Sequence, residues 1–213
     1  MNRRNASIGS ACAVLIGGLF LWAGAGSVSA EEPSEAQILN ALQSRSTRAV
    51  TRSLAEQRRS AEERRILEGL RTRSARSLTL GDRARIAEIA KDKPSIDIEI
   101  NFDYNSDIVG PKALRPLLAL GRVLSNEQFK GAIFLVNGHT DGKGGADFNQ
   151  DLSERRAEAV KRVLIEEYKL PADSLLAVGY GKTQLKNKCD PFAGENRRVQ
   201  IVNTEQQAAA KAK

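Results

Sequence analysis

The sequence contains very little histidine and cysteine. Its 213 residues include one histidine, His139, and two cysteines, Cys12 and Cys189. Zinc and other transition metals bind mainly through these residue types, and a disulfide framework needs several cysteines. We therefore expect no protein metal site, no cofactor and no fold that depends on disulfides.

Aromatic residues are also scarce. They make up 5% of the chain and are absent between residues 31 and 93, a stretch with 14 Lys and Arg against 10 Asp and Glu. The net charge of +7 suggests a nucleic-acid partner, but single strands bind largely by stacking on aromatic side chains. Glutamates are also interleaved with the arginines, so we expect no nucleic acid as a partner.

The chain has one long apolar run, which lies near the N-terminus. Residues 1–30 combine two arginines in "MNRRN", the run "ACAVLIGGLFLWAGAG" and the small residues "SVSA". This order is typical of a secretory signal peptide with cleavage after Ala30, whereas a membrane span needs about 20 apolar residues. We predict a cleaved signal peptide and an exported protein, with a retained anchor as the alternative. Cleavage would remove Cys12 and leave Cys189 as a lone loop cysteine.

Residues 31–80 are rich in arginine and have only a thin apolar stripe. "SEAQ" at residues 34–37 fits a capping box, which marks the start of a helix. The few aliphatic residues do not suffice for a core, so such a helix needs another surface to be stable. We predict a helical or disordered arm over residues 31–80, followed by a short helix and linker over residues 81–93.

Regular strand and helix patterns begin at Pro94. "SIDIEINF" alternates apolar and polar residues, as a half-buried strand does, and "GAIFLVNG", "SLLAVGYG" and "RRVQIVN" are further strands. "PKALRPLLALGRVLS" and "LSERRAEAVKRVLIEEYKL" are predicted helices, the second beginning near Leu152. The order βαβαββ over residues 94–203 predicts an α+β domain with one mixed sheet and helices on one face. Residues 204–213 are predicted to be a flexible tail.

The segment between the second strand and the long helix is rich in glycine. These glycines match neither a P-loop nor a dinucleotide fingerprint, so we assign them to a turn. His139 is interpreted as a histidine hydrogen-bonded at a strand end rather than as a catalytic base or metal ligand. The turn would bring an acid, Asp141, toward a base on the following helix, Arg156.

Four stretches of the chain match a known family in order and spacing: "INFDYNSDIV", "VNGHTDGKGGADFNQDLSERRAEAV", "LLAVGYGKTQ" and "NRRVQI". They resemble the OmpA C-terminal domain family, shared with Pal and MotB, which binds peptidoglycan. The resemblance covers about residues 95–203. Its central pattern, T-D-x-x-G-x-x-x-F-N-x-x-L-S-x-x-R-A, fits this chain from Thr140 to Ala157.

The resemblance implies a binding site for the diaminopimelate of the peptidoglycan stem peptide. One carbon of that amino acid bears both an ammonium group and a carboxylate. Asp141 would accept hydrogen bonds from the ammonium group, and Arg156 would bind the carboxylate through two parallel hydrogen bonds. Asn149 and Thr140 would complete the hydrogen bonding, with Arg197 nearby. The family also implies a Gram-negative protein of the periplasm or outer membrane.

Several functions stay open at this point. The first is non-enzymatic binding that tethers the protein, and the outer membrane or a partner, to the cell wall. Its arm would contact outer-membrane lipid or lipopolysaccharide, pair with a helix of a partner or of a second copy in a homodimer, or act as a solvated spacer. The alternative is a peptidoglycan-acting enzyme with Asp141 or Asp147 as general base. Asp141 and Arg156 would form only a structural ion pair if no ligand binds there.

Overall fold

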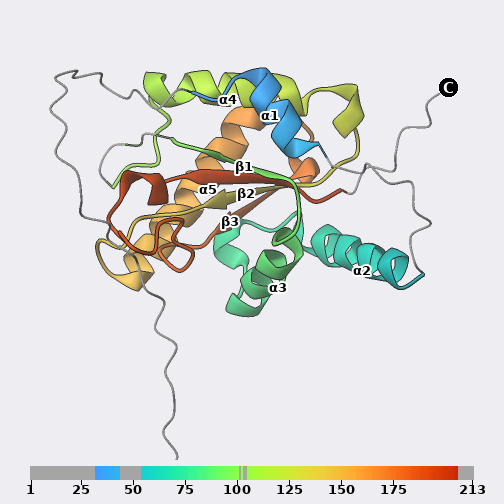
Figure 1. Ribbon diagram of the computed structural model, residues 1–213, viewed down its shortest axis with the longest axis horizontal. Coiled ribbons are helices and arrows are strands. Elements are labelled where there is room, and N and C mark those ends of the chain that lie inside the picture. The colour runs from blue at the N-terminus through green and yellow to red at the C-terminus, as the bar shows by residue number, and fades with distance from the viewer. Residues whose placement is uncertain (1–31, 44–53, 101, 103–104, 206–213) are drawn as a thin grey trace, which may run out of the picture. The chain divides into compact units, whose positions relative to one another are not determined.

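The computed structural model describes residues 32–43, 54–100, 102 and 105–205 (Figure 1). The predicted signal peptide, part of the predicted arm and most of the predicted tail lie outside these residues. From Glu32 onward the described residues belong to one compact unit. None of its described helices is both long and apolar enough to span a membrane. The helices are α1 (Glu35–Leu42), α2 (Leu54–Leu70), α3 (Leu80–Ala90), α4 (Pro111–Leu124) and α5 (Ala146–Tyr168), and the strands are β1 (Ser95–Ile98), β2 (Phe134–Gly138), β3 (Leu175–Gly179) and β4 (Val199–Asn203).

The four strands form one mixed sheet in the order β1-β4-β2-β3. β2 and β3 are parallel and are joined by α5, whereas β4 lies between β1 and β2 and runs antiparallel to both. Every residue of β2 and β3 is buried, as is usual for parallel strands with helices on both faces. The sheet and its helices confirm the predicted α+β class.

Helix α5 is longer than its pattern predicted. It begins at Ala146 rather than near Leu152, with Gly145 in the N-cap position. The predicted start was wrong because Asp147, Phe148 and Asn149 have low helix propensity and follow a run of glycines, which hid the first turns. The additional residues include Phe148 and Asn149, whose positions are therefore fixed by the helix.

One face of the sheet is covered by α4, α5 and the short helix α1 (Figure 1). α1 starts with the predicted capping box, in which Ser34 and Gln37 exchange hydrogen bonds. Its Ile38 and Leu42 are fully buried in the core. The side-chain amide of Asn203 donates a hydrogen bond to the Leu42 carbonyl oxygen (3.0 Å). Residues of the predicted arm therefore complete this core.

The other face of the sheet is covered by α2 and α3, which precede Pro94 (Figure 1). The predicted placement on one face is correct for the helices between residues 94 and 203. A helical arm and a short helix were predicted upstream of Pro94, but not that these helices, α2 and α3, cover the second face of the sheet. Their apolar stripe is thin, but it meets a sheet face that is itself apolar, so a small number of side chains suffices. The buried residues in this layer are Leu67, Leu70, Leu78, Ile86 and Ile89, packed against Ile133, Leu135, Leu176, Val178, Tyr180 and Val202.

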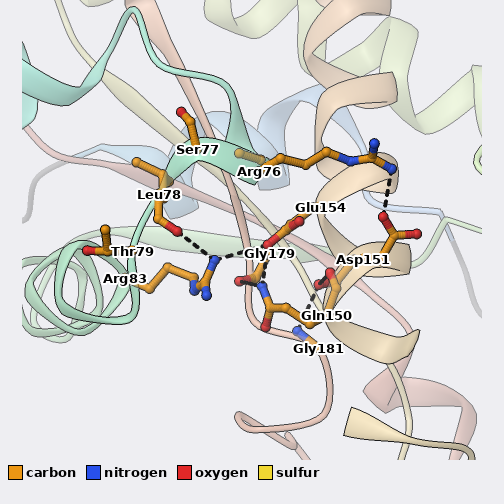
Figure 2. A network of polar contacts seen from close by, with 12 residues as sticks. Arg76, Ser77, Leu78, Thr79, Arg83, Gln150, Asp151, Glu154, Gly179 and Gly181 are labelled. Atoms are coloured by element: carbon orange, nitrogen blue, oxygen red, sulfur yellow. Dashed lines mark hydrogen bonds and ion pairs between the residues drawn. The ribbon is translucent and has the colours of Figure 1, made fainter. Parts of the chain in front are cut away.

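A polar network also fastens the upstream segment to α5 (Figure 2). The Arg83 guanidinium donates to the Leu78 carbonyl oxygen (2.9 Å) and to the Glu154 carboxylate (3.0 Å). Gln150 donates to the same Glu154 oxygen (2.8 Å) and to the Gly179 carbonyl oxygen at the end of β3 (2.7 Å). The side chains of Arg83 and Glu154 are 15% and 9% exposed. This ion pair is therefore part of the packed interior.

Candidate functional site

The predicted turn lies where the parallel strands β2 and β3 end. The Thr140 N–H donates to the Gly181 carbonyl oxygen (2.9 Å), which joins the turn to the segment after β3. Gly144 has a φ of +89°, a left-handed conformation that favours glycine. The side-chain amide of Asn149 donates to two carbonyl oxygens of the turn, at 2.8 and 2.9 Å. The turn is therefore held in one conformation against α5.

The Asp141 carboxylate accepts hydrogen bonds from two donors. Oδ1 accepts from the backbone N–H of Lys143 (3.1 Å), and Oδ2 accepts from Nη1 of Arg197 (2.9 Å). The Asp141 side chain is 17% exposed and that of Arg197 is 48% exposed. The sequence suggested Arg156 as the partner in a structural ion pair with Asp141. In the structure Asp141 pairs with Arg197, which lies just before β4.

Arg156 is a buried base on α5, with 7% of the residue exposed. Its Nε donates to the Ser106 carbonyl oxygen (3.0 Å), and its guanidinium carbon lies 4.7 Å from the centroid of the Phe102 ring. Burial, assisted by the charges of Arg155 and Arg197 and opposed by that of Asp141, lowers the pKa of Arg156 to about 10. The side chain is therefore still charged at neutral pH, in a poorly solvated place.

All five predicted site residues line one open pocket of about 950 Å³. Thr140 and Asp141 come from the turn, Asn149 and Arg156 from α5, and Arg197 from the loop before β4. A volume of this size is in the range of small-molecule binding sites. The remaining lining residues are Phe102, Asn105, Lys143, Gly144, Phe148, Leu152 and Phe192.

The sequence model of the family described as "OmpA family" matches residues 101–198. This segment belongs to the OmpA family. The match includes the turn, α5 and the loop that bears Arg197, so it covers all five predicted site residues. It confirms the resemblance drawn from the motif between Thr140 and Ala157.

Two curated relatives contain related sequence. The outer membrane porin F of Pseudomonas aeruginosa is 32% identical over 127 residues, which are 59% of this chain and 34% of the porin. The peptidoglycan-associated lipoprotein of the same organism is 34% identical over 102 residues, 47% of this chain and 58% of the lipoprotein. This chain thus matches about a third of the porin and just over half of the lipoprotein.

Among solved structures, the peptidoglycan-associated lipoprotein from Burkholderia pseudomallei aligns with a TM-score of 0.42 and 24% identity. The alignment covers 54% of this chain and 92% of that protein.

Two of the predicted site residues in the OmpA-family domain are buried and form hydrogen bonds within the protein. Asn149 is 2% exposed, and its amide nitrogen is used by the turn. Thr140 is 3% exposed, and its Oγ1 donates to the Asp141 carbonyl oxygen (3.2 Å). Both residues position the turn, whereas Asp141, Arg156 and Arg197 are the predicted site residues whose charges line the pocket, together with that of Lys143.

The loop before β4 in the OmpA-family domain depends on a residue that the sequence analysis missed. The Asn196 side chain is fully buried; its nitrogen donates to three loop carbonyl oxygens at 3.0 to 3.2 Å, and its oxygen accepts a loop N–H at 2.9 Å. The Gly142 N–H donates to the Pro191 carbonyl oxygen (2.7 Å) and joins this loop to the turn. The loop therefore presents Phe192 to the pocket, and Cys189 lies exposed on it. The only sequence signal was the "NRR" triplet that Asn196 begins.

His139 precedes the site but is not among the residues that line the pocket. It is 2% exposed and stacks on Tyr180, with ring centroids 5.5 Å apart. The expected hydrogen bond is not present with normal geometry: among the described residues neither ring nitrogen has such a partner, and the Gln184 backbone has only a weak influence on the ring. Burial, assisted by the positive charge of Arg198, lowers the pKa of His139 to about 3, so the ring is neutral at physiological pH.

Proposed function

We propose that this chain binds peptidoglycan without cleaving it, through the diaminopimelate of the stem peptide, and thereby tethers itself to the cell wall. Membership of residues 101–198 in the OmpA family supports this function, as does the similarity to a peptidoglycan-associated lipoprotein. The single observation on which the proposal depends most is that Asp141, Arg156 and Arg197 line one open pocket.

The two arginines differ in a way that suits a ligand with both charges. Arg156 is buried and fixed, so it provides a permanent binding point for a carboxylate. Arg197 is 48% exposed and pairs with Asp141 at the pocket. Under this proposal the ligand ammonium takes the place of Arg197 on Asp141, and Arg197 turns to the ligand carboxylate beside Arg156. Binding of a zwitterion would thus replace the single Asp141–Arg197 ion pair by ion pairs of the ligand ammonium with Asp141 and of the ligand carboxylate with Arg156 and Arg197.

The size of the expected effect follows from the burial of these groups. Removing one partner of a buried, hydrogen-bonded charge pair at an interface costs about 2–5 kcal/mol. That cost corresponds to a loss of roughly 30-fold to several thousand-fold in affinity. Asp141→Ala and Arg156→Ala should each remove most of the binding. Arg156→Lys, which keeps the charge and loses the planar fork, should retain part of it.

The test is pulldown of the protein with purified sacculi of two kinds, one with diaminopimelate in the stem peptide and one with lysine in its place. We expect the wild-type protein to bind the diaminopimelate sacculi selectively. Arg162→Ala is the matched control, because Arg162 is an exposed arginine of the same helix and does not line the pocket. Equal binding to both kinds of sacculi, or full binding by both Asp141→Ala and Arg156→Ala, would contradict the proposal.

The enzymatic alternative depends on Asp141 or Asp147 acting as a general base. The Asp141 carboxylate is already engaged by the Arg197 guanidinium and by the backbone N–H of Lys143. Asp147 is exposed on α5 and is not among the residues that line the pocket. We therefore favour binding over cleavage. Release of soluble muropeptides from sacculi by the wild-type protein, and not by Asp141→Ala or Asp147→Ala, would reverse this preference.

We also propose that the protein acts in the periplasm or at the outer membrane of a Gram-negative envelope. The predicted signal peptide and the outer-membrane relatives support this location. We further propose that the arm has a partner of its own. The candidates are outer-membrane lipid, lipopolysaccharide, and a helix of another protein or of a second copy. Six arginines of residues 31–93 already form ion pairs with acidic side chains. They are Arg59, Arg64, Arg71, Arg73, Arg76 and Arg83.

These pairs reduce the charge that an anionic membrane would meet. Flotation of the protein with anionic liposomes at low and high salt tests the lipid part, since binding by basic residues weakens as salt screens it. Flotation that salt does not change would argue against a charge-driven contact.

A further inference from the structure

Two phenylalanine side chains that line the pocket are exposed to solvent. Phe148, near the start of α5, is 41% exposed, and Phe192, on the loop before β4, is 65% exposed. A single exposed apolar side chain is ordinary on a protein surface. Two aromatic rings at one charged pocket are a more specific feature, because apolar surface beside a binding site commonly contacts the ligand.

The backbone that carries each ring is held in place by neighbouring residues. The Phe192 N–H donates to the Asp190 carboxylate (3.1 Å), and the preceding residue, Pro191, accepts hydrogen bonds from Gly142 and Asn196. A side chain at Gly142 would lie 3.0 Å from the Pro191 ring, which shows how closely the loop approaches the turn. Phe148 is fixed by α5, and its ring would lie 3.6 Å from a Cβ atom at Gly144. Phe148 and Phe192 therefore lie on elements that both contact the turn that bears Asp141.

The charged residues account for only one end of a peptidoglycan fragment. The stem peptide is attached to a sugar of the glycan strand, and a pyranose ring presents an apolar face of C–H groups that suits an aromatic ring. When diaminopimelate is the third residue of the stem, three extended residues span roughly 10 Å. A pocket of about 950 Å³ has comparable dimensions, so a sugar at the rim and diaminopimelate at Arg156 are compatible.

We propose that Phe148 and Phe192 form a second subsite, an aromatic platform for a sugar ring of the glycan strand whose stem peptide occupies the charged pocket. This inference rests on the proposed function. Phe192 is the more exposed ring and provides the larger part of the platform. The platform makes the protein prefer a peptide that is still attached to sugar over the same peptide without sugar.

The test compares two purified ligands by calorimetry: the disaccharide tetrapeptide and the free tetrapeptide, both containing diaminopimelate. We expect the wild-type protein to bind the disaccharide form about three- to tenfold more tightly, the scale of one aromatic contact. Phe192→Ala should lose this difference and keep the affinity for the free peptide, and Phe148→Ala should lose part of it. Phe192→Tyr should behave like the wild type, and Leu54→Ala is the control for loss of an exposed apolar side chain elsewhere.

Each result has a distinct meaning. If the wild-type protein binds both ligands equally, or if Phe192→Ala weakens both equally, the sugar subsite is refuted while the peptide pocket stands. In the second case the ring contacts the peptide instead. If the wild-type protein binds neither ligand, the proposed function itself fails. Melting curves of each variant confirm that the altered protein is folded.

Discussion

Helix α5 takes part in two groups of oppositely charged side chains, one on each side of the helix. The Arg83 group contains Arg83 and Glu154, and the Arg156 group contains Arg156 and Asp141. The two groups differ in how far they are shielded from solvent. Glu154 and Arg156 are two positions apart, which places their side chains roughly 200° apart around the helix axis. On one side, Glu154 and Arg83 are packed with Gln150 and are almost completely covered (Figure 2). On the other side, Arg156 lines a pocket of about 950 Å³ together with Asp141.

The comparison shows how a structural ion pair differs from a binding site made of the same residue types. Both groups contain an arginine that is shielded from water. In the Arg83 group the protein itself supplies the acceptors for the guanidinium, which are the Glu154 carboxylate and the Leu78 carbonyl oxygen. In the Arg156 group the charges border a cavity. Residue type and spacing alone do not distinguish the two groups, whereas enclosure does.

Removal of the upstream segment should have the largest effect. A chain of residues 94–213 lacks α1, α2, α3 and Arg83, and thereby uncovers one face of the sheet and part of the core on the other. The five aliphatic side chains lost from that layer contribute about 2 kcal/mol each, which together is comparable with the whole stability of a domain, about 5–15 kcal/mol. We expect this fragment to be unfolded or aggregated, as judged by circular dichroism and size-exclusion chromatography. Residues 32–213 are the control and should melt cooperatively; a cooperative melt of the shorter chain would contradict the expectation.

The next test separates stability from binding. Glu154→Ala leaves Arg83 without its acid in a nearly closed interior, which should cost about 2–4 kcal/mol after allowance for partial exposure. Thermal melting should detect this loss, while the protein that remains folded should still bind sacculi. The double change Arg83→Met with Glu154→Leu should recover much of the stability, because two apolar side chains can replace a buried pair. Arg156→Ala should show the reverse result, with binding lost and melting changed far less.

The order of strands and helices after Pro94 could be predicted because their patterns are local. Alternation in "SIDIEINF" and the continuous apolar run in "GAIFLVNG" reflect which side of each strand is buried. The five site residues were predicted from the family motif, and the structure brings them together. Their roles in binding remain predictions, which the sacculus experiments address.

The upstream layer could not be predicted from local signals. Leu67 and Ile86 form a thin stripe that indicates some partner surface without identifying it, and the partner proved to be the second face of the sheet. Arg83 and Glu154 are 71 positions apart, so no periodicity connects them. The partner of Asp141 was likewise set by the path of the loop that Asn196 organises rather than by spacing along the chain.

His139 offers a test of a third kind of buried polar group, one with no hydrogen-bond partner among the described residues. Its pKa is lowered from its ordinary value of 6.5 to about 3 in the folded protein. The unfolded chain therefore binds a proton between these pH values that the folded protein does not, and stability falls as the pH drops from about 6.5 toward 3. The expected slope is about 1.4 kcal/mol per pH unit from this residue.

The measurement is the difference in unfolding free energy between wild type and His139→Phe, which keeps a ring against Tyr180. The difference should be constant above pH 7 and should move in favour of the variant as the pH falls. A difference that does not change with pH would mean that the buried histidine is not neutral.

The smallest effect is expected at Asp151, which lies between the two groups on the exposed surface of α5. It accepts hydrogen bonds from Arg76 (2.6 Å) and Arg155 (2.8 Å), but its side chain is 47% exposed. The hydrogen bond from Arg155 and the nearby positive charges lower the pKa of Asp151, so its contribution to stability is present above its ordinary pKa and is lost as the pH falls through the lowered value. Because solvent screens such pairs, Asp151→Asn should cost less than about 1 kcal/mol at neutral pH and almost nothing in 1 M salt. A larger, salt-independent loss would show that exposed pairs also hold the upstream segment on α5, and that enclosure alone does not decide which charges are structural.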